Sequence, residues 1–163
     1  EERHFDKALA QHAEATRLNP SFAEAYYQMG RIHAYQWNYE KARGFYQKAL
    51  SLDPELADAH YGMGRIEGEQ GSIEKAIASY REAIRLNPRH TYALCRLGLA
   101  YGATGRWDEA VSALEAAVRV DSTYTKAHYS LGQAYLKLGR KGEALRELAL
   151  AGKIRAAPQR LDE

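Results

Sequence analysis

The stretch that decides the fold runs from Ala23 to Glu55 and reads AEAYYQMGRIHAYQWNYEKARGFYQKALSLDPE. Its pattern recurs three more times at a fixed step of 34 residues. Small residues and prolines keep this step: Gly30, Gly64, Gly98 and Gly132; Ala42, Ala76, Ala110 and Ala144; Ala49, Ala83, Ala117 and Ala151; Pro20, Pro54 and Pro88. A repeat of this length indicates stacked units that each bury an apolar face on their neighbours.

Each repeat divides into two segments with helical periodicity. In the first, expected at about residues 22–35, one face carries residues at i, i+3, i+4 and i+7, namely Tyr26, Met29, Gly30 and His33. The second helix is expected at about 39–52. Residues 1–20 have the pattern of a second helix without its first, and they end at Asn19-Pro20.

With its small-residue spacing and closing proline, this unit resembles the tetratricopeptide repeat (TPR), a helix-turn-helix unit. The resemblance implies an all-α fold: a TPR-type α-solenoid of antiparallel helix pairs wound into a right-handed superhelix. We expect a single array over residues 1–158, with a partial repeat at 1–20, full repeats at 23–56, 57–90, 91–124 and 125–158, and a tail or truncated further helix at 159–163.

Two local expectations concern the ends of the first helices. Ser21 and Glu24 have the spacing of a capping box, so Ser21 is expected to cap the helix that follows. Later repeats place a glycine at the bend (Gly71, Gly105, Gly139), where the first full repeat has Trp37-Asn38. Asparagine tolerates the left-handed conformation, so we expect Asn38 to adopt it.

Composition excludes several classes of protein. The chain has 23 lysines and arginines against 21 acidic residues, and a net charge of +2 is too balanced for nucleic-acid binding. With Cys95 as the single cysteine, no intrachain disulfide is expected. No apolar run approaches the roughly 18 residues of a membrane span. Because the chain begins with glutamate, we expect a fragment or a processed form.

A second stripe runs along the first helix of each repeat, beside the packing stripe. In TPR proteins the equivalent stripe lines a concave groove that holds peptides. Here it contains Tyr27, Arg31, Tyr61, Arg65, Cys95, Leu99, Tyr129 and Gln133. Tyrosine and arginine are enriched at binding hot spots, and guanidinium groups suit carboxylates. Cys95 and Leu99 favour a hydrophobic anchor. Alternatively, the tyrosines pack between adjacent helices and the arginines bond to Glu67 or Glu69.

The other motifs favour neither chaperone binding nor catalysis. Of the carboxylate clamp found in chaperone-binding TPR domains, only Arg96 matches, although it stays a groove candidate. His60 and His128 are expected to pack between helices, because two repeats separate them and a shared metal is out of reach. Cys95 has no candidate base at a suggestive spacing, so we expect no catalytic residue, metal or cofactor.

Residues 125–158 carry seven basic and two acidic residues. This local excess of +5 is either a solvated outer face or a docking surface for an acidic partner. The sequence therefore predicts a non-enzymatic scaffold for protein–protein interaction that binds a peptide, acidic or aromatic in character, in the groove. One alternative is a homo-oligomer joined through the terminal helices (Phe5, Leu9, Leu145, Leu148). Another is a docking segment of a larger enzyme.

Overall fold

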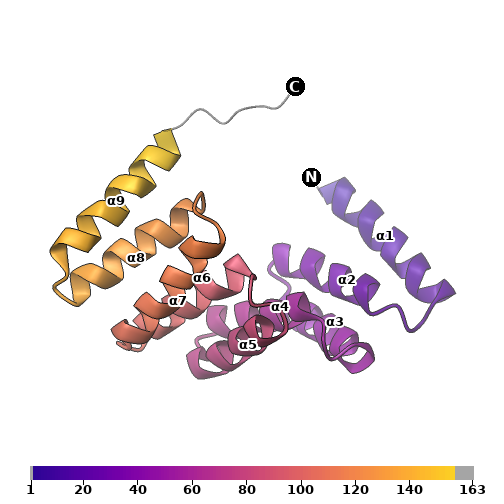
Figure 1. Cartoon of the computed structure of the whole chain (residues 1–163). Helices are drawn as coiled ribbons and strands as arrows, with labels where there is room; N and C mark the ends of the chain where they lie inside the picture. The colour runs from indigo at the N-terminus through magenta and orange to yellow at the C-terminus, as the bar shows by residue number, and fades with distance from the viewer. Residues whose placement is uncertain (1, 157–163) are drawn as a thin grey trace. The chain divides into compact units, whose positions relative to one another are not determined.

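The computed structural model describes residues 2–156, which are helical throughout apart from short connections (Figure 1). The helices are α1 (Glu2–Leu18), α2 (Ala23–Tyr35), α3 (Tyr39–Leu52), α4 (Ala57–Glu69), α5 (Ile73–Leu86), α6 (Thr91–Ala103), α7 (Trp107–Val120), α8 (Thr125–Lys137) and α9 (Lys141–Ala156). The chain divides into two compact units, residues 1–88 (unit 1) and 89–163 (unit 2). Each unit is described by itself.

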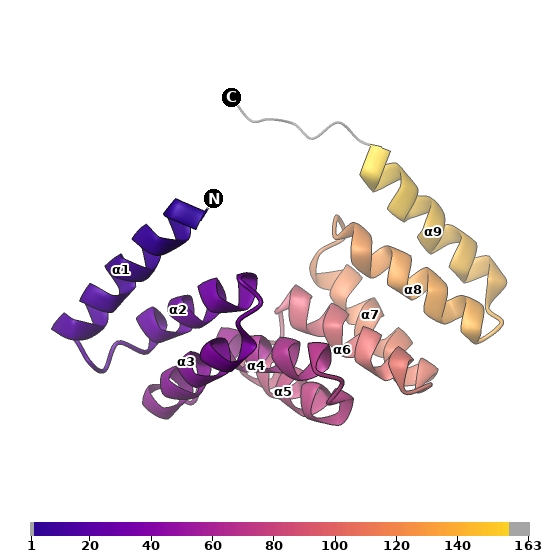
Figure 2. The same cartoon turned by 180° about the vertical axis from the view of Figure 1, so that it is seen from behind.

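Within each unit, consecutive helices pack as pairs. In unit 1, α2 packs on α3 and α4 on α5, while α1 packs on α2 and α3 on α4. In unit 2, α6 packs on α7 and α8 on α9, and α8 also contacts α6 and α7 (Figure 2). The helices predicted at about 22–35 and 39–52 are α2 and α3, so these two predictions are confirmed.

The four glycines spaced by 34 residues let the two helices of each pair approach closely. A Cβ atom on each would lie 2.5–2.7 Å from a side chain of the facing helix: Tyr46 for Gly30, Tyr80 for Gly64, Leu114 for Gly98 and Leu148 for Gly132. Such distances are too short for any real Cβ contact. The packing reason predicted for these glycines is therefore confirmed, and it outweighs the cost of about 1 kcal/mol that glycine carries inside a helix.

The bend between α2 and α3 differs from its prediction. Trp37, and not Asn38, has the left-handed backbone, with φ of 60°. It stands 34 residues before Gly71, which has φ of 76°, so the repeat imposes this conformation even on a bulky residue. Asn38 instead caps α3, because its Oδ1 accepts a hydrogen bond from the Lys41 amide at 3.4 Å.

The capping box predicted at the start of α2 is wrong. The residue that precedes the helix is Phe22, and it makes no side-chain cap. Glu24 accepts a hydrogen bond from Gln28 Nε2 at 2.5 Å and does not reach back to the chain. Ser21 donates its amide to Asn19 Oδ1 at 3.1 Å, so it belongs to the preceding turn.

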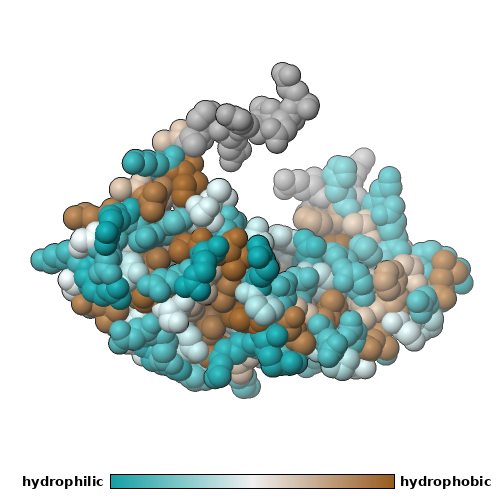
Figure 3. Space-filling view, in the orientation of Figure 1, coloured by the Kyte–Doolittle hydropathy of each residue, from teal (hydrophilic) through white to brown (hydrophobic). Residues whose placement is uncertain are grey.

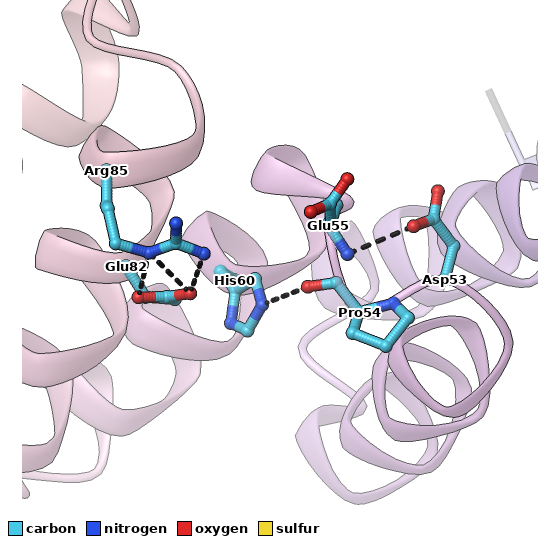
Figure 4. Close-up of polar contacts among 6 residues, drawn as sticks. All are labelled: Asp53, Pro54, Glu55, His60, Glu82 and Arg85. Carbon is cyan, nitrogen blue, oxygen red and sulfur yellow. Dashed lines mark hydrogen bonds and ion pairs between the residues drawn. The ribbon is translucent and has the colours of Figure 1, made fainter.

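The two histidines predicted to pack between helices each bind a loop carbonyl. His60 on α4 donates from Nε2 to the Pro54 carbonyl oxygen at 2.9 Å (Figure 4). His128 on α8 makes the same contact with the Ser122 carbonyl at 3.0 Å. It also contacts Glu147 of α9, with 2.7 Å between Nδ1 and Oε2. Both rings thereby fix the entry of their helix, as the packing interpretation requires.

Candidate interaction surfaces

Two of the groove candidates in unit 1 come from the middle of α2. Tyr27 is only 8% exposed, and its ring lies 5.9 Å from the ring of Tyr46 on α3. Arg31 is exposed, with its guanidinium 5.8 Å from the centre of the Tyr27 ring. Its Nη1 donates to Gln28 Oε1 at 2.9 Å. Tyr27 thus serves mainly as a buried platform, while Arg31 presents charge to solvent.

The other two candidates in unit 1 come from α4. Arg65 is half-buried and places its guanidinium 5.9 Å from the centre of the Tyr35 ring on α2. Tyr61 is half-buried, with its ring 6.0 Å from that of Tyr80 on α5. Together with Tyr27 and Arg31 these residues form a cluster of aromatic rings and guanidinium groups across α2 and α4, which we call the α2–α4 surface.

No carboxylate within residues 2–156 forms an ion pair with Arg31 or Arg65. The acid proposed as a partner, Glu67, instead accepts a hydrogen bond from Ser79 Oγ at 2.6 Å. The Nε atom of Arg65 is buried and has no hydrogen-bond partner in that part of the chain. Buried donors in proteins are nearly always satisfied, so this guanidinium has capacity for an acceptor that the described residues do not provide.

The tyrosines below these arginines are neutral at physiological pH. Burial raises the pKa of Tyr46 to about 12, despite the nearby positive charges of Arg65 and Arg31. Burial and the charge of Asp58 raise the pKa of Tyr27 well above its ordinary value. Each ring therefore offers the arginines a neutral π face, and the positive charge of the α2–α4 surface stays uncompensated by phenolate.

In unit 2 the groove candidates separate into buried and accessible residues. Cys95 on α6 is 1% exposed, and burial raises the pKa of its thiol above the ordinary value. It offers no surface to a ligand, so the anchoring role expected for it is not available in this structure. Arg96 is half-buried, whereas Tyr129 on α8 is 56% exposed and Gln133 is also exposed.

Three candidates of unit 2 line an apolar pocket of about 370 Å³ between α6, α7 and α8. They are Leu99, Tyr129 and Gln133, and Trp107 of α7 forms another wall. Gly102 makes room for the indole, because a Cβ there would lie 2.9 Å from Trp107 Cζ3. The pocket has the size and lining of a site for an aromatic or aliphatic side chain.

A second pocket of about 620 Å³ lies between α8 and α9. Tyr129 contributes to both pockets, and here Leu148 and Ala151 join it, while Lys126 and Arg155 supply positive charge. Figure 3 shows apolar surface over this end of the chain. The exposed leucines of the two helices are Leu136, Leu145 and Leu150.

Sequence reasoning missed two residues of these surfaces. Tyr35, below Arg65, stands at the last position of the groove stripe in its helix, so extending the stripe by one turn finds it. Trp107 was interpreted only as a packing residue. Within residues 2–156, no group of three or more histidine, cysteine, aspartate or glutamate side chains could hold a metal ion. No helix there combines the length and apolarity that a membrane span needs.

Comparison with family models gives three matches along the chain. A model described as "TPR repeat" matches residues 64–105, and two described as "Tetratricopeptide repeat" match residues 23–56 and 95–160. The chain belongs to the tetratricopeptide-repeat family. A search of curated protein sequences finds no match.

Solved TPR structures share the fold. A crystal structure of MamA superposes with a TM-score of 0.80 at 26% identity, covering 93% of this chain and 88% of MamA. YrrB, described as "a TPR protein with an unusual peptide-binding site", gives 0.74 at 28% identity, covering 94% and 79%. PilF of Pseudomonas aeruginosa gives 0.85 at 20% identity, covering 93% and 69%, a likeness of fold alone. The chain is an all-α TPR solenoid.

Proposed function

We propose that this TPR protein is an interaction scaffold that binds peptide segments of a partner protein. The general role is supported by the family and by YrrB, whose peptide-binding site is stated in its description. The finer proposal is that the stripe of unit 1 on α2 and α4 recognises acidic residues, while the apolar pocket of unit 2 accepts a large apolar side chain.

One observation carries the proposal for unit 1. Arg31 and Arg65 stand against the faces of aromatic rings and form no ion pair within residues 2–156. Guanidinium groups held in this way lose little side-chain freedom when they bind a carboxylate. An acidic peptide would supply the acceptors that both groups lack, and the aromatic rings would add contact area at low entropic cost.

In unit 2 the support comes from shape. The pocket beside Trp107 is apolar and about the volume of a large side chain, and Gln133 at its edge has an amide that can bond a peptide backbone. A ligand for this unit therefore needs an aromatic or aliphatic anchor more than it needs charge. Its affinity would come from apolar burial, at about 25 cal/mol per Å².

The proposal is tested by selecting peptides from a displayed random library on the full chain at low salt. We expect enrichment of peptides with acidic residues whose affinity falls about tenfold or more with Arg31→Ala plus Arg65→Ala. The matched control, Lys75→Ala plus Arg81→Ala, removes the same charge from exposed positions of α5 and should leave binding unchanged. Equal loss in both double variants would reduce the effect to net charge and contradict the assignment.

The face between α8 and α9 favours a second candidate function, association between copies of the chain. Leu145 is 67% exposed, and Leu148 and Tyr129 line an open pocket there. Sedimentation velocity across the micromolar range tests this function. A mass that rises with concentration, and that Leu145→Glu returns to that of one chain, would support it; a constant single-chain mass would exclude it.

A further inference from the structure

A third pocket lies on unit 1, on a face of α2 that differs from the α2–α4 surface. Its volume is about 500 Å³, and it is lined by Tyr26 and His33 of α2 and by Lys41, Gly44, Phe45 and Lys48 of α3. We call it the α2–α3 pocket. Tyr26 and His33 are two helical turns apart and therefore share one face of α2, which is turned about 100° from Tyr27.

Gly44 is the feature that opens the pocket. It lies inside α3, where glycine costs about 1 kcal/mol relative to alanine. Unlike the glycines between paired helices, it has no atom within 4 Å of the place where a Cβ would stand, and its φ is not in the left-handed range. Neither close packing nor a turn explains this glycine. Its effect is to leave free space between Lys41 and Lys48.

The aromatic floor replaces polar contacts that close the same region in other repeats. Phe45 stacks on His33, with ring centres 5.3 Å apart and planes 3° from parallel. The residues 34 and 102 positions after Phe45 are Ser79 and Glu147, and both are hydrogen-bonded to the facing helix of their pair. In contrast, His33 Nδ1 is buried with no partner within residues 2–156.

The rim of the pocket is positively charged. Lys48 places its ammonium 5.8 Å from the centre of the Tyr26 ring, and Lys41 lies about two turns earlier on α3. Neither lysine forms an ion pair within the described part of the chain, and no acidic residue lines the pocket. The full set of two lysines, two aromatic rings, a histidine and a glycine does not recur in the later repeats. The packing of the repeat therefore does not require it.

We infer that the α2–α3 pocket is a second binding site, for a peptide segment that carries an acidic side chain beside a large apolar one. The apolar side chain would enter the space left by Gly44 and cover the rings of Tyr26 and Phe45. The acidic group would lie between the two ammonium groups, which compensate its charge. This site is independent of the groove proposed above, because none of its residues belongs to the α2–α4 surface.

The test uses the full chain and a displayed random-peptide library, with Gly44→Leu as the principal variant. Leucine at this position fills the pocket, and it should not harm the fold because a Cβ there meets open space and leucine favours helix. Lys41→Glu plus Lys48→Glu reverses the charge of the rim. Lys75→Glu is the matched control, since it changes the charge at the position of Lys41 in the next repeat.

We expect one class of selected peptides, with an acidic residue within two positions of a large apolar one, to bind about tenfold or more weakly to Gly44→Leu and to the rim variant. The same peptides should bind equally well to Lys75→Glu and to Arg31→Ala plus Arg65→Ala, which separates this site from the groove. If no selected peptide is weakened by Gly44→Leu, the inference is overturned. It is also overturned if Gly44→Leu abolishes self-association in sedimentation velocity, because the occupant would then be a second copy.

Discussion

The two units build the same helix pairs from different side chains. In unit 1 a tyrosine packs over the glycine of each pair, and in unit 2 a leucine does. The ring of Tyr46 fits because it meets glycine twice: a Cβ at either Gly30 or Gly62 would lie 2.6 Å from it. At the position of Gly62, unit 2 has Ser130. The glycine and alanine grid thus sets the backbone, while one residue per pair decides how much room an aromatic ring has.

The same difference extends to the surfaces. Unit 1 combines tyrosine rings with arginines on α2 and α4, so its surface is aromatic and cationic. Unit 2 has an apolar pocket lined by Leu99, Trp107 and Tyr129. Two units with one backbone pattern therefore favour different ligands, which means that the repeat pattern alone does not determine specificity.

The largest effect is expected from a bulky residue at a packed glycine. Gly98→Leu should reduce the free energy of unfolding by about 3 kcal/mol, because its Cβ would stand 2.5 Å from Leu114 Cγ. Gly44→Leu, the same change where a Cβ meets open space, should instead stabilise the chain by about 0.5–1 kcal/mol. Urea unfolding followed by circular dichroism measures both. Similar losses in both variants would refute the packing role of the grid.

Exchanging the aromatic and aliphatic residues tests the contrast between the units. Tyr46→Leu should cost about 2 kcal/mol, because it leaves a void between two glycines. Leu114→Tyr should cost a similar amount by overpacking against Ser130. The combination Leu114→Tyr with Ser130→Gly should recover part of that loss, as a double-mutant cycle in urea would reveal. Strict additivity of the two changes would show that Ser130 does not limit the ring.

The bend of the first full repeat provides a smaller effect of opposite sign. Trp37→Gly should stabilise unit 1 by up to about 1 kcal/mol, because it removes a side chain from a left-handed backbone. The indole is 75% exposed, so little burial is lost beyond its edge contact with Tyr39. Gly71→Ala, at the equivalent bend, should destabilise by a similar amount. Thermal unfolding of the two variants compares the bends directly.

The smallest expected effect is a dependence on pH at His33. Burial and the charge of Lys41 lower its pKa below the ordinary 6.5. The unfolded chain then binds more protons than the folded chain as the pH falls through 6.5, so the contribution of His33 to stability is present above that pH and lost below it. Because the ring is partly solvated, we expect a few tenths of a kcal/mol. His33→Gln should flatten the difference between pH 7.5 and 5.5; an unchanged difference would contradict this origin.

Much of the fold follows from the 34-residue step. Helix positions and the close approach at the four glycines could be predicted, because small residues at fixed spacing have few other uses inside a helix. The bend at Trp37 was mispredicted for a physical reason: the preference of asparagine for the left-handed conformation is weaker than the backbone path that the repeat imposes. The start of α2 failed similarly, since the backbone leading into it makes Phe22 the residue before the helix.

The candidate surfaces were less predictable. Position in the stripe does not determine burial, which is 8% exposed for Tyr27, 1% for Cys95 and 56% for Tyr129. Those values depend on which helices cover each residue, and Cys95 lies on α6, against which both α7 and α8 pack. The α2–α3 pocket was missed because it arises from the absence of a side chain at Gly44, and sequence periodicity emphasises the residues that are present.

The measurement that tests the account most directly is the salt dependence of peptide binding to the full chain and two variants. We predict separate classes among the selected peptides. One class is weakened by Arg31→Ala plus Arg65→Ala, and its binding to the native chain falls as salt rises, because exposed charges are screened within about 10 Å at 0.1 M salt. Another is weakened by Tyr129→Ala and is nearly insensitive to salt. A single class, affected equally by both variants and with one salt dependence, would contradict the view that the two units present chemically different binding surfaces.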